Sequence, residues 1–136
     1  MSDGHLSFCK AIFVRNSTNS IFFDYPTFKT FARSEEMHSA FTEYILTLIR
    51  DCIEKYGSFE MHMNLKSFSI TAAQRYSNII RMFCNRCLQC NTEFSKLLTK
   101  MYLYNSPRIL GSISAIFIGF LDDHVRSKIQ FIESSV

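Results

Sequence analysis

Glycine is scarce in this chain, and several short motifs that mark enzymes are absent. Only four of the 136 residues are glycine, so a glycine-rich phosphate-binding loop has little from which to form. The sequence contains no His-Glu-x-x-His and no Gly-x-Ser-x-Gly, and its four histidines are dispersed. We therefore expect neither enzymatic activity nor a cofactor.

Long hydrophobic runs are absent too. The longest apolar segment, residues 109–121, is interrupted by polar or small residues and is shorter than the ~20 residues that a membrane-spanning helix requires. Residues 1–5 lack Lys and Arg and do not look like a secretory signal. The five cysteines, an odd number, then indicate free thiols in a reducing compartment. These features predict a cytoplasmic protein that meets membranes only at their surface.

Charge of one sign forms no run. Lys and Arg total 15 against 12 Asp and Glu, which gives a net charge of +3 and a pI near 8.6. This mild excess favours an acidic partner such as an anionic membrane surface. The interleaved aromatic and basic residues of an RNA-binding sheet are missing, so we expect no nucleic acid partner.

Apolar residues, in contrast, are plentiful. They make up 47% of the chain, and Phe alone occurs 14 times. A chain of this length is expected to form one domain, here residues 1–136, with apolar side chains to spare. The surplus could line a cavity, or it could fill a core and an oligomer interface.

Segments with strand and helix patterns alternate along the chain. We predict strands at residues 8–14, 21–25, 59–65, 101–104 and 128–132, of which the first two form a hairpin at a sheet edge. Helices are predicted at residues 34–56, 71–88 and 108–121, with a shorter one around residues 94–98. Gly57 ends the first helix, and Thr71 with Gln74 forms a capping box for the second. Strands that alternate with helices predict an α/β fold with a mainly parallel sheet and crossover helices.

Three cysteines have the spacing of metal ligands. Cys84, Cys87 and Cys90 could hold zinc or an iron–sulfur cluster if loop geometry and a fourth ligand were provided. The first two fall on the apolar face of the predicted helix, and the sequence has no second cysteine pair. We interpret them as small buried hydrophobic residues and predict no metal site.

The second half of the chain resembles the CRAL-TRIO lipid-binding family. A buried strand ends in Asn-x-Pro at Asn105 to Pro107, an apolar helix follows, and Phe120-Leu121-Asp122 and Ser127-Lys128-Ile129 come next. Upstream, residues 64–69 are similar to the strand ending Asp-x-Lys-Gly-x-Ser of that family. The order of these motifs covers residues 58–132. Members of the family include phosphatidylinositol-transfer proteins and retinal- and tocopherol-binding proteins.

The resemblance implies a lipid or another hydrophobic small molecule, such as a phosphoinositide, in an apolar pocket. Helix 108–121 would be its gate, swinging aside at a membrane so that the ligand can be transferred; the alternative is a helix packed permanently on the sheet. The residues expected to line the pocket are Tyr102, Tyr104, Ile113, Phe117, Phe120 and Leu121.

Two lysines are candidates for the lipid head group. Lys128 occupies the Ser-Lys-Ile position that meets the lipid phosphate in phosphoinositide-binding members, although a lysine there could also serve only to keep an edge strand soluble. Lys96 stands where family members often have Glu, and it could itself attract a phosphate.

The chain departs from the family pattern at both ends. The usual N-terminal helical domain and the last strand and helix of the sheet are missing, so we expect some tendency to form a homodimer through an exposed sheet edge or helix 108–121. Two other readings of the sequence stay open. The first is a protein-interaction module whose pocket is filled by its own phenylalanines. The second is a sulfate-transporter/anti-sigma-antagonist-like domain with a phosphorylatable Ser67 or Ser69.

Overall fold

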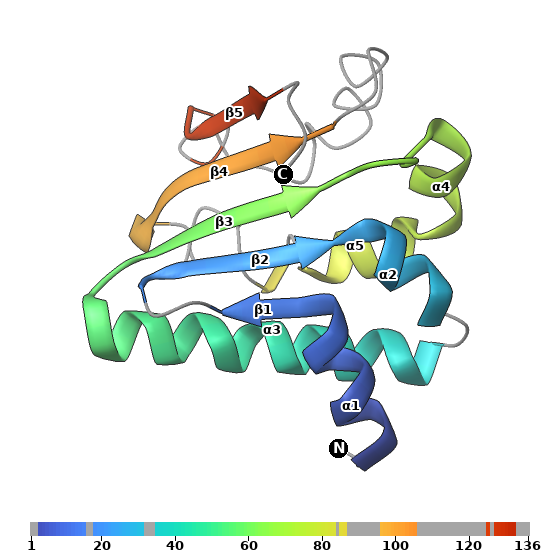
Figure 1. The fold of residues 1–136 in the computed structure, drawn as a ribbon, viewed down its shortest axis with the longest axis horizontal. Coiled ribbons are helices and arrows are strands. Elements are labelled where there is room, and N and C mark those ends of the chain that lie inside the picture. The colour runs from blue at the N-terminus through green and yellow to red at the C-terminus, as the bar shows by residue number, and fades with distance from the viewer. Residues whose placement is uncertain are drawn as a thin grey trace.

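A five-stranded sheet forms the centre of the computed structural model, which describes residues 3–15, 18–31, 35–83, 85–86, 96–105, 125 and 127–132 (Figure 1). Its strands are β1 (Phe13–Arg15), β2 (Ser20–Asp24), β3 (Phe59–Asn64), β4 (Leu98–Tyr104) and β5 (Ile129–Ile132), and they lie in that order across the sheet. The helices are α1 (Asp3–Ile12), α2 (Tyr25–Phe31), α3 (Glu35–Tyr56), α4 (Ile70–Arg75) and α5 (Ser77–Phe83).

The sheet is mainly parallel. β1 is antiparallel to β2, whereas β2, β3, β4 and β5 run parallel to their neighbours. Along the chain, α3 connects β2 with β3, and α4 and α5 lie between β3 and β4. The predicted α/β fold, with its mainly parallel sheet and an edge hairpin near the N-terminus, is confirmed.

The first predicted strand is wrong for residues 8–12. These residues belong to α1, where Cys9 and Ile12 are fully buried, and α1 packs against α2 and α3. Only the three residues of β1 pair with β2. A short apolar run has too few residues to separate a helix period from a strand period, so tertiary packing decides between them.

The helix predicted at residues 34–56 is confirmed as α3. One side of it supplies five buried apolar residues to the core, namely Phe41, Ile45, Leu46, Ile49 and Cys52. At its end, Gly57 has φ +77°, a left-handed conformation that favours glycine, and its N–H donates to the carbonyl of Ile53 at 2.8 Å. The helix therefore begins and ends close to where the sequence pattern predicted.

The helix predicted at residues 71–88 begins earlier and is divided. Its N-cap is Ser69, whose hydroxyl accepts from the N–H of Ala72 at 3.1 Å, so the predicted capping box at Thr71 is wrong. Tyr76 ends α4, and α5 follows immediately. Cys84, Cys87 and Cys90 lie outside the described residues. Leu98, predicted in a short helix, is the first residue of β4 instead.

Helix α2 was not predicted, and Asp24 explains why it forms. The Asp24 carboxylate accepts from the backbone N–H of Thr27 at 3.0 Å and from its hydroxyl at 2.6 Å, as an N-cap residue does. The side chain of Asn64 donates to the same carboxylate at 2.8 Å, which ties the start of α2 to the end of β3. Burial alone raises the pKa of Asp24, but these three hydrogen bonds outweigh it and lower the pKa below its ordinary value of 3.8.

We expect Asp24→Ala to lower the free energy of unfolding by about 1 to 2 kcal/mol at neutral pH, because the helix loses its cap. Since the folded-state pKa is depressed, the stabilisation by the Asp24 carboxylate is present above pH 3.8 and is lost as the pH falls through the folded-state value. Urea unfolding at pH 7 and pH 3 measures this effect. The stability difference between wild type and variant should shrink at pH 3. The control Glu54→Ala removes an exposed carboxylate of α3 and should show no such change.

Candidate functional site

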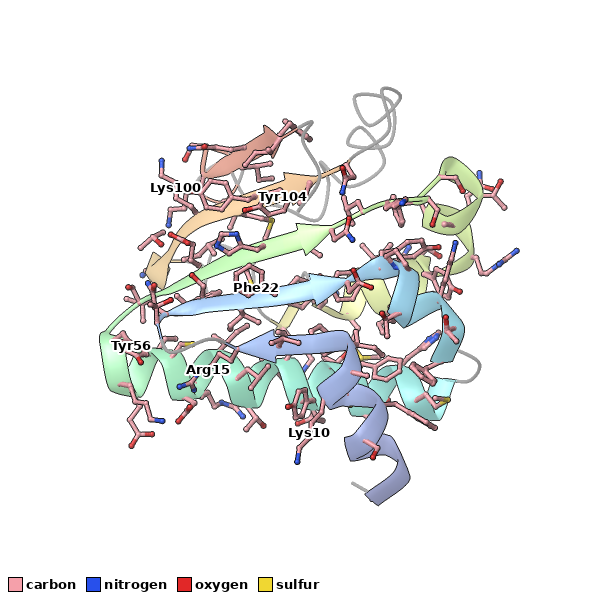
Figure 2. The ribbon with its side chains drawn as sticks, in the orientation of Figure 1. Lys10, Arg15, Phe22, Tyr56, Lys100 and Tyr104 are labelled. Carbon is pink, nitrogen blue, oxygen red and sulfur yellow. The ribbon has the colours of Figure 1, made fainter. Side chains whose placement is uncertain are left out.

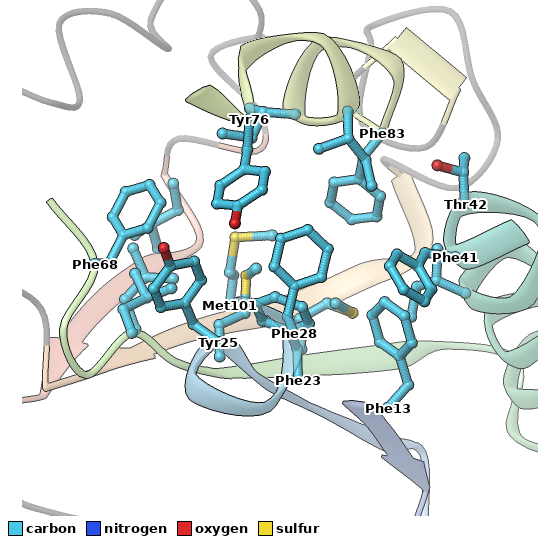
Figure 3. A pocket seen from close by; sticks show the side chains of 18 of the residues that line it. Phe13, Phe23, Tyr25, Phe28, Phe41, Thr42, Phe68, Tyr76, Phe83 and Met101 are labelled. Carbon is cyan, nitrogen blue, oxygen red and sulfur yellow. The ribbon is translucent and has the colours of Figure 1, made fainter. Parts of the chain in front are cut away.

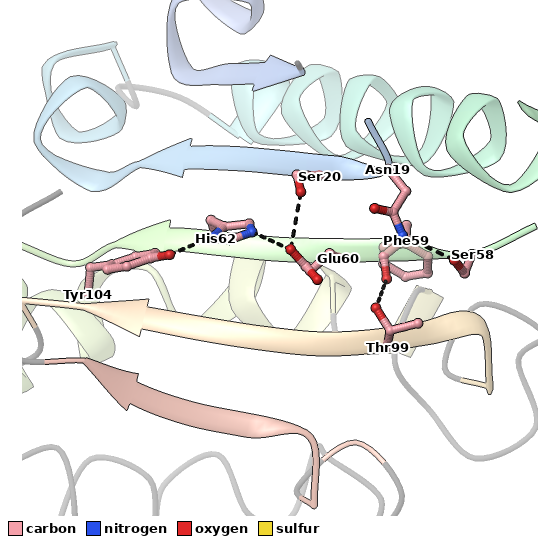
Figure 4. A network of polar contacts seen from close by, with 8 residues as sticks. All are labelled: Asn19, Ser20, Ser58, Phe59, Glu60, His62, Thr99 and Tyr104. Atoms are coloured by element: carbon pink, nitrogen blue, oxygen red, sulfur yellow. Dashed lines mark hydrogen bonds and ion pairs between the residues drawn. The ribbon is translucent and has the colours of Figure 1, made fainter. Parts of the chain in front are cut away.

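An apolar pocket of about 210 Å³ lies between the sheet and the helices (Figure 3). Every strand contributes to it, together with α2, α3 and the segment from Tyr76 to Phe83. Figure 4 views the sheet from its other face, with helices behind it. Residues of α3 and α5 line the pocket together with residues of the strands, so the pocket and both helices lie on the same face of the sheet.

Strand register explains the floor of the pocket. Phe13, Phe23, Met63, Leu103 and Phe131 are successive cross-strand neighbours, so one row of apolar side chains crosses all five strands. A second row contains Met61, Met101 and Ile129. Because side chains alternate between the faces of a strand, these residues all point to the pocket face.

The walls of the pocket are apolar and aromatic. They include Phe28 from α2, Phe41 and Ile45 from α3, and Ile79 and Phe83 from α5. The pocket lining contains no charged side chain among the described residues. Such a site offers hydrophobic and dispersion contacts, and it offers nothing to neutralise a charge.

Tyr102 and Tyr104, which were predicted to line the pocket, lie on the opposite face of the sheet. On β4 the pocket is lined by Met101 and Leu103, and the two tyrosines alternate with them. The prediction failed because residues 101–104 are all apolar or aromatic, so their pattern does not show which face is which. The other predicted lining residues, Ile113, Phe117, Phe120 and Leu121, lie outside the described residues, as does helix 108–121.

Sequence reasoning missed most of the residues that form the pocket. Only the alternation of Met61, Met63 and Leu65 in the predicted strand at residues 59–65 signalled a row of side chains on one face. That row lines the pocket. No comparable signal marked Phe28 or Phe41, whose place in the pocket depends on how α2 and α3 pack on the sheet.

The two lysines predicted to meet a lipid head group lie next to each other. The ammonium group of Lys128 donates to the backbone carbonyl of Lys96 at 3.5 Å. Lys96 shortly precedes β4 and Lys128 immediately precedes β5, so both are at the amino ends of these parallel strands. The structure therefore places the Lys128 ammonium group against the backbone of Lys96, at the amino ends of two strands that line the pocket.

The opposite face of the sheet carries an aromatic and polar cluster centred on His62 (Figure 4). The His62 ring stacks between Phe22 and Tyr102, with centroid distances of 4.5 and 4.8 Å. Its Nδ1 lies 2.6 Å from the Tyr104 hydroxyl, and its Nε2 lies 2.8 Å from the Glu60 carboxylate. Phe22 and Tyr104 project from the sheet face shown in Figure 2. These contacts link β2, β3 and β4.

Tyr104 remains protonated at neutral pH. Its burial, followed by the proximity of Tyr102 and Glu60, raises the pKa of this phenol above its ordinary value. A nucleophile would need a lowered pKa. We therefore assign Tyr104 a structural role as a hydrogen-bonding partner of His62.

Two buried cysteines, Cys9 and Cys52, are also poorly suited to act as nucleophiles. Burial raises the pKa of the Cys9 thiol to about 11 and also raises the pKa of Cys52, despite the opposing effect of Arg15 on the latter. Within the described part of the chain, no group of three or more His, Cys, Asp or Glu side chains is placed to hold a metal ion. The described helices also include none that is long and apolar enough to span a membrane.

Comparison with known protein families identifies the fold. Residues 15–136, most of the chain, match the CRAL/TRIO domain. The chain belongs to the CRAL/TRIO domain family. The predicted family membership is thus confirmed, and the family is one of lipid-binding proteins.

A solved structure supports the same fold. The crystal structure of Sfh5 is similar to this CRAL/TRIO chain with a TM-score of 0.69 and 14% sequence identity. The similarity covers 89% of this chain and 46% of the Sfh5 chain, so the chain spans less than half the length of this neighbour. No curated protein matches the sequence. At this identity the likeness to Sfh5 shows the fold alone.

Proposed function

We propose that this CRAL/TRIO domain binds the hydrocarbon part of a lipid, or another apolar small molecule, in the pocket between the sheet and the helices. The observation that carries the proposal is a space of about 210 Å³ whose described lining has no charged side chain. A pocket of this kind, in a chain from a lipid-binding family, is suited to an apolar ligand that dissolves poorly in water.

The driving force for such binding is burial of apolar surface. Each CH₂ group that leaves water contributes about 0.8 kcal/mol. The aromatic and methionine side chains of the lining also make many dispersion contacts with a hydrocarbon, and methionine adapts to irregular shapes. The presence of this space favours a lipid carrier over a protein-interaction module, because in such a module the phenylalanines of the chain itself would fill the pocket.

The finer parts of the function stay predictions. These predictions are that helix 108–121 moves, that the ligand is transferred between membranes, and that Lys128 and Lys96 contact a phosphate. The closeness of Lys128 to Lys96 supports a head-group site at the amino ends of β4 and β5. Exposure of Phe131, at 56%, on the edge strand β5 supports contact with a membrane surface or a second copy of the chain.

Native mass spectrometry tests the proposal. The purified chain is incubated with vesicles of phosphatidylcholine and phosphatidylinositol that also contain a fatty alcohol, and is then separated from them. We expect a stoichiometric mass increase that corresponds to one of these molecules. A bare polypeptide mass, with the chain folded, would contradict the proposal and favour the protein-interaction module. The identity of the bound molecule reports directly on head-group selection.

A further inference from the structure

Strand β5 ends the sheet on a side that is open to further pairing. It is the last strand in the order across the sheet, and among the described residues no strand lies beyond it (Figure 1). The strand, Ile129 to Ile132, includes no charged side chain and no proline. Natural sheet edges often carry lysine or proline, which discourage a second strand from adding. Lys128 precedes the strand, and its ammonium group is directed to the carbonyl of Lys96.

The hydrogen bonds to β4 show which backbone groups of β5 point outward. The carbonyl of Lys128 accepts from the N–H of Met101 at 3.0 Å, and the carbonyl of Ile132 accepts from the residue after β4 at 3.1 Å. Backbone groups of consecutive strand residues point alternately to the two neighbouring strands. The N–H and C=O groups of Ile129 and Phe131 are therefore directed away from β4, toward the position of a further strand.

Phe131 is half covered although it lines the pocket. Its side chain is 56% exposed, and it shares the pocket face of β5 with Ile129. The row of apolar side chains that forms the floor of the pocket thus ends in an aromatic ring that meets water. A further strand beside β5 would cover this ring and close the pocket on this side.

A second copy of β5 matches this edge. In an antiparallel pair with a two-fold axis at Gln130, Ile129 lies opposite the partner subunit's Phe131, and Phe131 lies opposite the partner subunit's Ile129. Since these are the residues whose backbone groups point outward, each opposite pair exchanges both of its N–H···O bonds. Directly opposite side chains lie on the same face, so each phenyl ring packs on an isoleucine, and such aromatic and β-branched pairs stabilise a sheet.

We propose that two copies of the chain associate through their β5 edges, in the antiparallel register centred on Gln130, so that the two sheets become continuous. The interface is isologous, because both copies use the same edge. The partner subunit's Phe131 then lies beside Ile129 at the rim of the pocket, and each pocket is completed by a side chain of the other copy. This inference goes beyond the proposed function, because the association requires no ligand.

Sedimentation velocity over a range of concentrations tests the association. We expect the wild-type chain to form a dimer at tens of micromolar and to dissociate on dilution, as a small interface does. Phe131→Lys puts a cation at the edge, and we expect it to weaken the association at least about tenfold. The matched control is Val14→Lys, since Val14 is 53% exposed on the other edge strand, β1, and this variant should associate as the wild type does.

Cysteine cross-linking tests the register. Gln130 is exposed, and its side chain faces away from the pocket. At the two-fold axis it lies opposite its own copy, with a Cα separation of about 4.5 Å, which a disulfide can span. Gln130→Cys should therefore give a covalent dimer on mild oxidation. Ile132→Cys is the control, because residue 132 lies roughly 13 Å from its own copy in this register. The wild-type chain, with its five cysteines, measures the background.

The outcomes separate the inference from its rivals. Circular dichroism first establishes that each variant is folded. A folded wild-type chain that stays monomeric overturns the inference, as does a dimer that Phe131→Lys leaves intact, or equal cross-linking of Gln130→Cys and Ile132→Cys. A monomer whose binding to phosphatidylcholine vesicles is lost in Phe131→Lys would assign the edge to a membrane surface instead. The proposed function fails separately, if the folded chain takes up no lipid whether it is monomeric or dimeric.

Discussion

Leu103→Trp is expected to reduce 1-octanol binding at least tenfold. Leu103 lies near the carboxyl end of β4 and its side chain lines the pocket, between Met63 of β3 and Phe131 of β5. An indole ring at this position occupies space that the ligand needs. Because the pocket already offers about 210 Å³, we expect the ring to be accommodated with little of the overpacking strain that a filled core would impose.

The neighbouring position on the same strand provides the control. Tyr102→Trp introduces the same ring one residue away, but Tyr102 faces the opposite side of the sheet. NMR titration with 1-octanol should therefore give an unchanged affinity for Tyr102→Trp and a strongly reduced one for Leu103→Trp. Wild-type affinity in a folded Leu103→Trp variant would show that ligand binds elsewhere on the protein.

Phe59→Ala is expected to lower the free energy of unfolding by about 3 to 5 kcal/mol, the range for removal of a fully buried Phe. Phe59 starts the central strand β3, is 0% exposed and does not line the pocket. It pairs with Leu98, which is also buried, so its removal leaves a void in the core beneath two strands. Since small domains are stable by about 5 to 15 kcal/mol, this loss is a large fraction of the total.

Urea unfolding measured by circular dichroism checks this expectation. Val14→Ala is a suitable control, because Val14 is 53% exposed on the edge strand β1, and we expect a loss below about 1 kcal/mol. A loss for Phe59→Ala as small as that for Val14→Ala would mean that the start of β3 is not part of the core.

The sequence predicted the elements whose pattern is long or strictly periodic. α3 was found because its apolar residues keep helical spacing over 22 residues and a glycine ends it. β3 was found from alternation, and the order of strands and helices implied the parallel sheet. Short motifs were not needed for this prediction, because the hydrophobic pattern alone indicates which segments must be buried.

The same pattern could not predict α1, α2 or the interruption at Tyr76. Residues 8–12 are a short apolar run, which fits a strand as well as a helix. α2 depends on Asp24, whose carboxylate is held by Thr27 and by Asn64 from a distant part of the sequence. Local propensity is a weak determinant in such segments, and contacts formed only after the chain has folded decide their conformation.

The sequence by itself determined that this chain forms an α/β sheet covered by apolar helices, because burial of its many hydrophobic residues permits few other arrangements. Only the tertiary structure decided which face of β4 meets the pocket, since the apolar and aromatic run at residues 101–104 gives no sign of its orientation. It also decided that Tyr25 and Tyr76, far apart along the chain, share one pocket. Side chains from separate elements meet only when the sheet and its helices pack, and that packing is not encoded in any single segment.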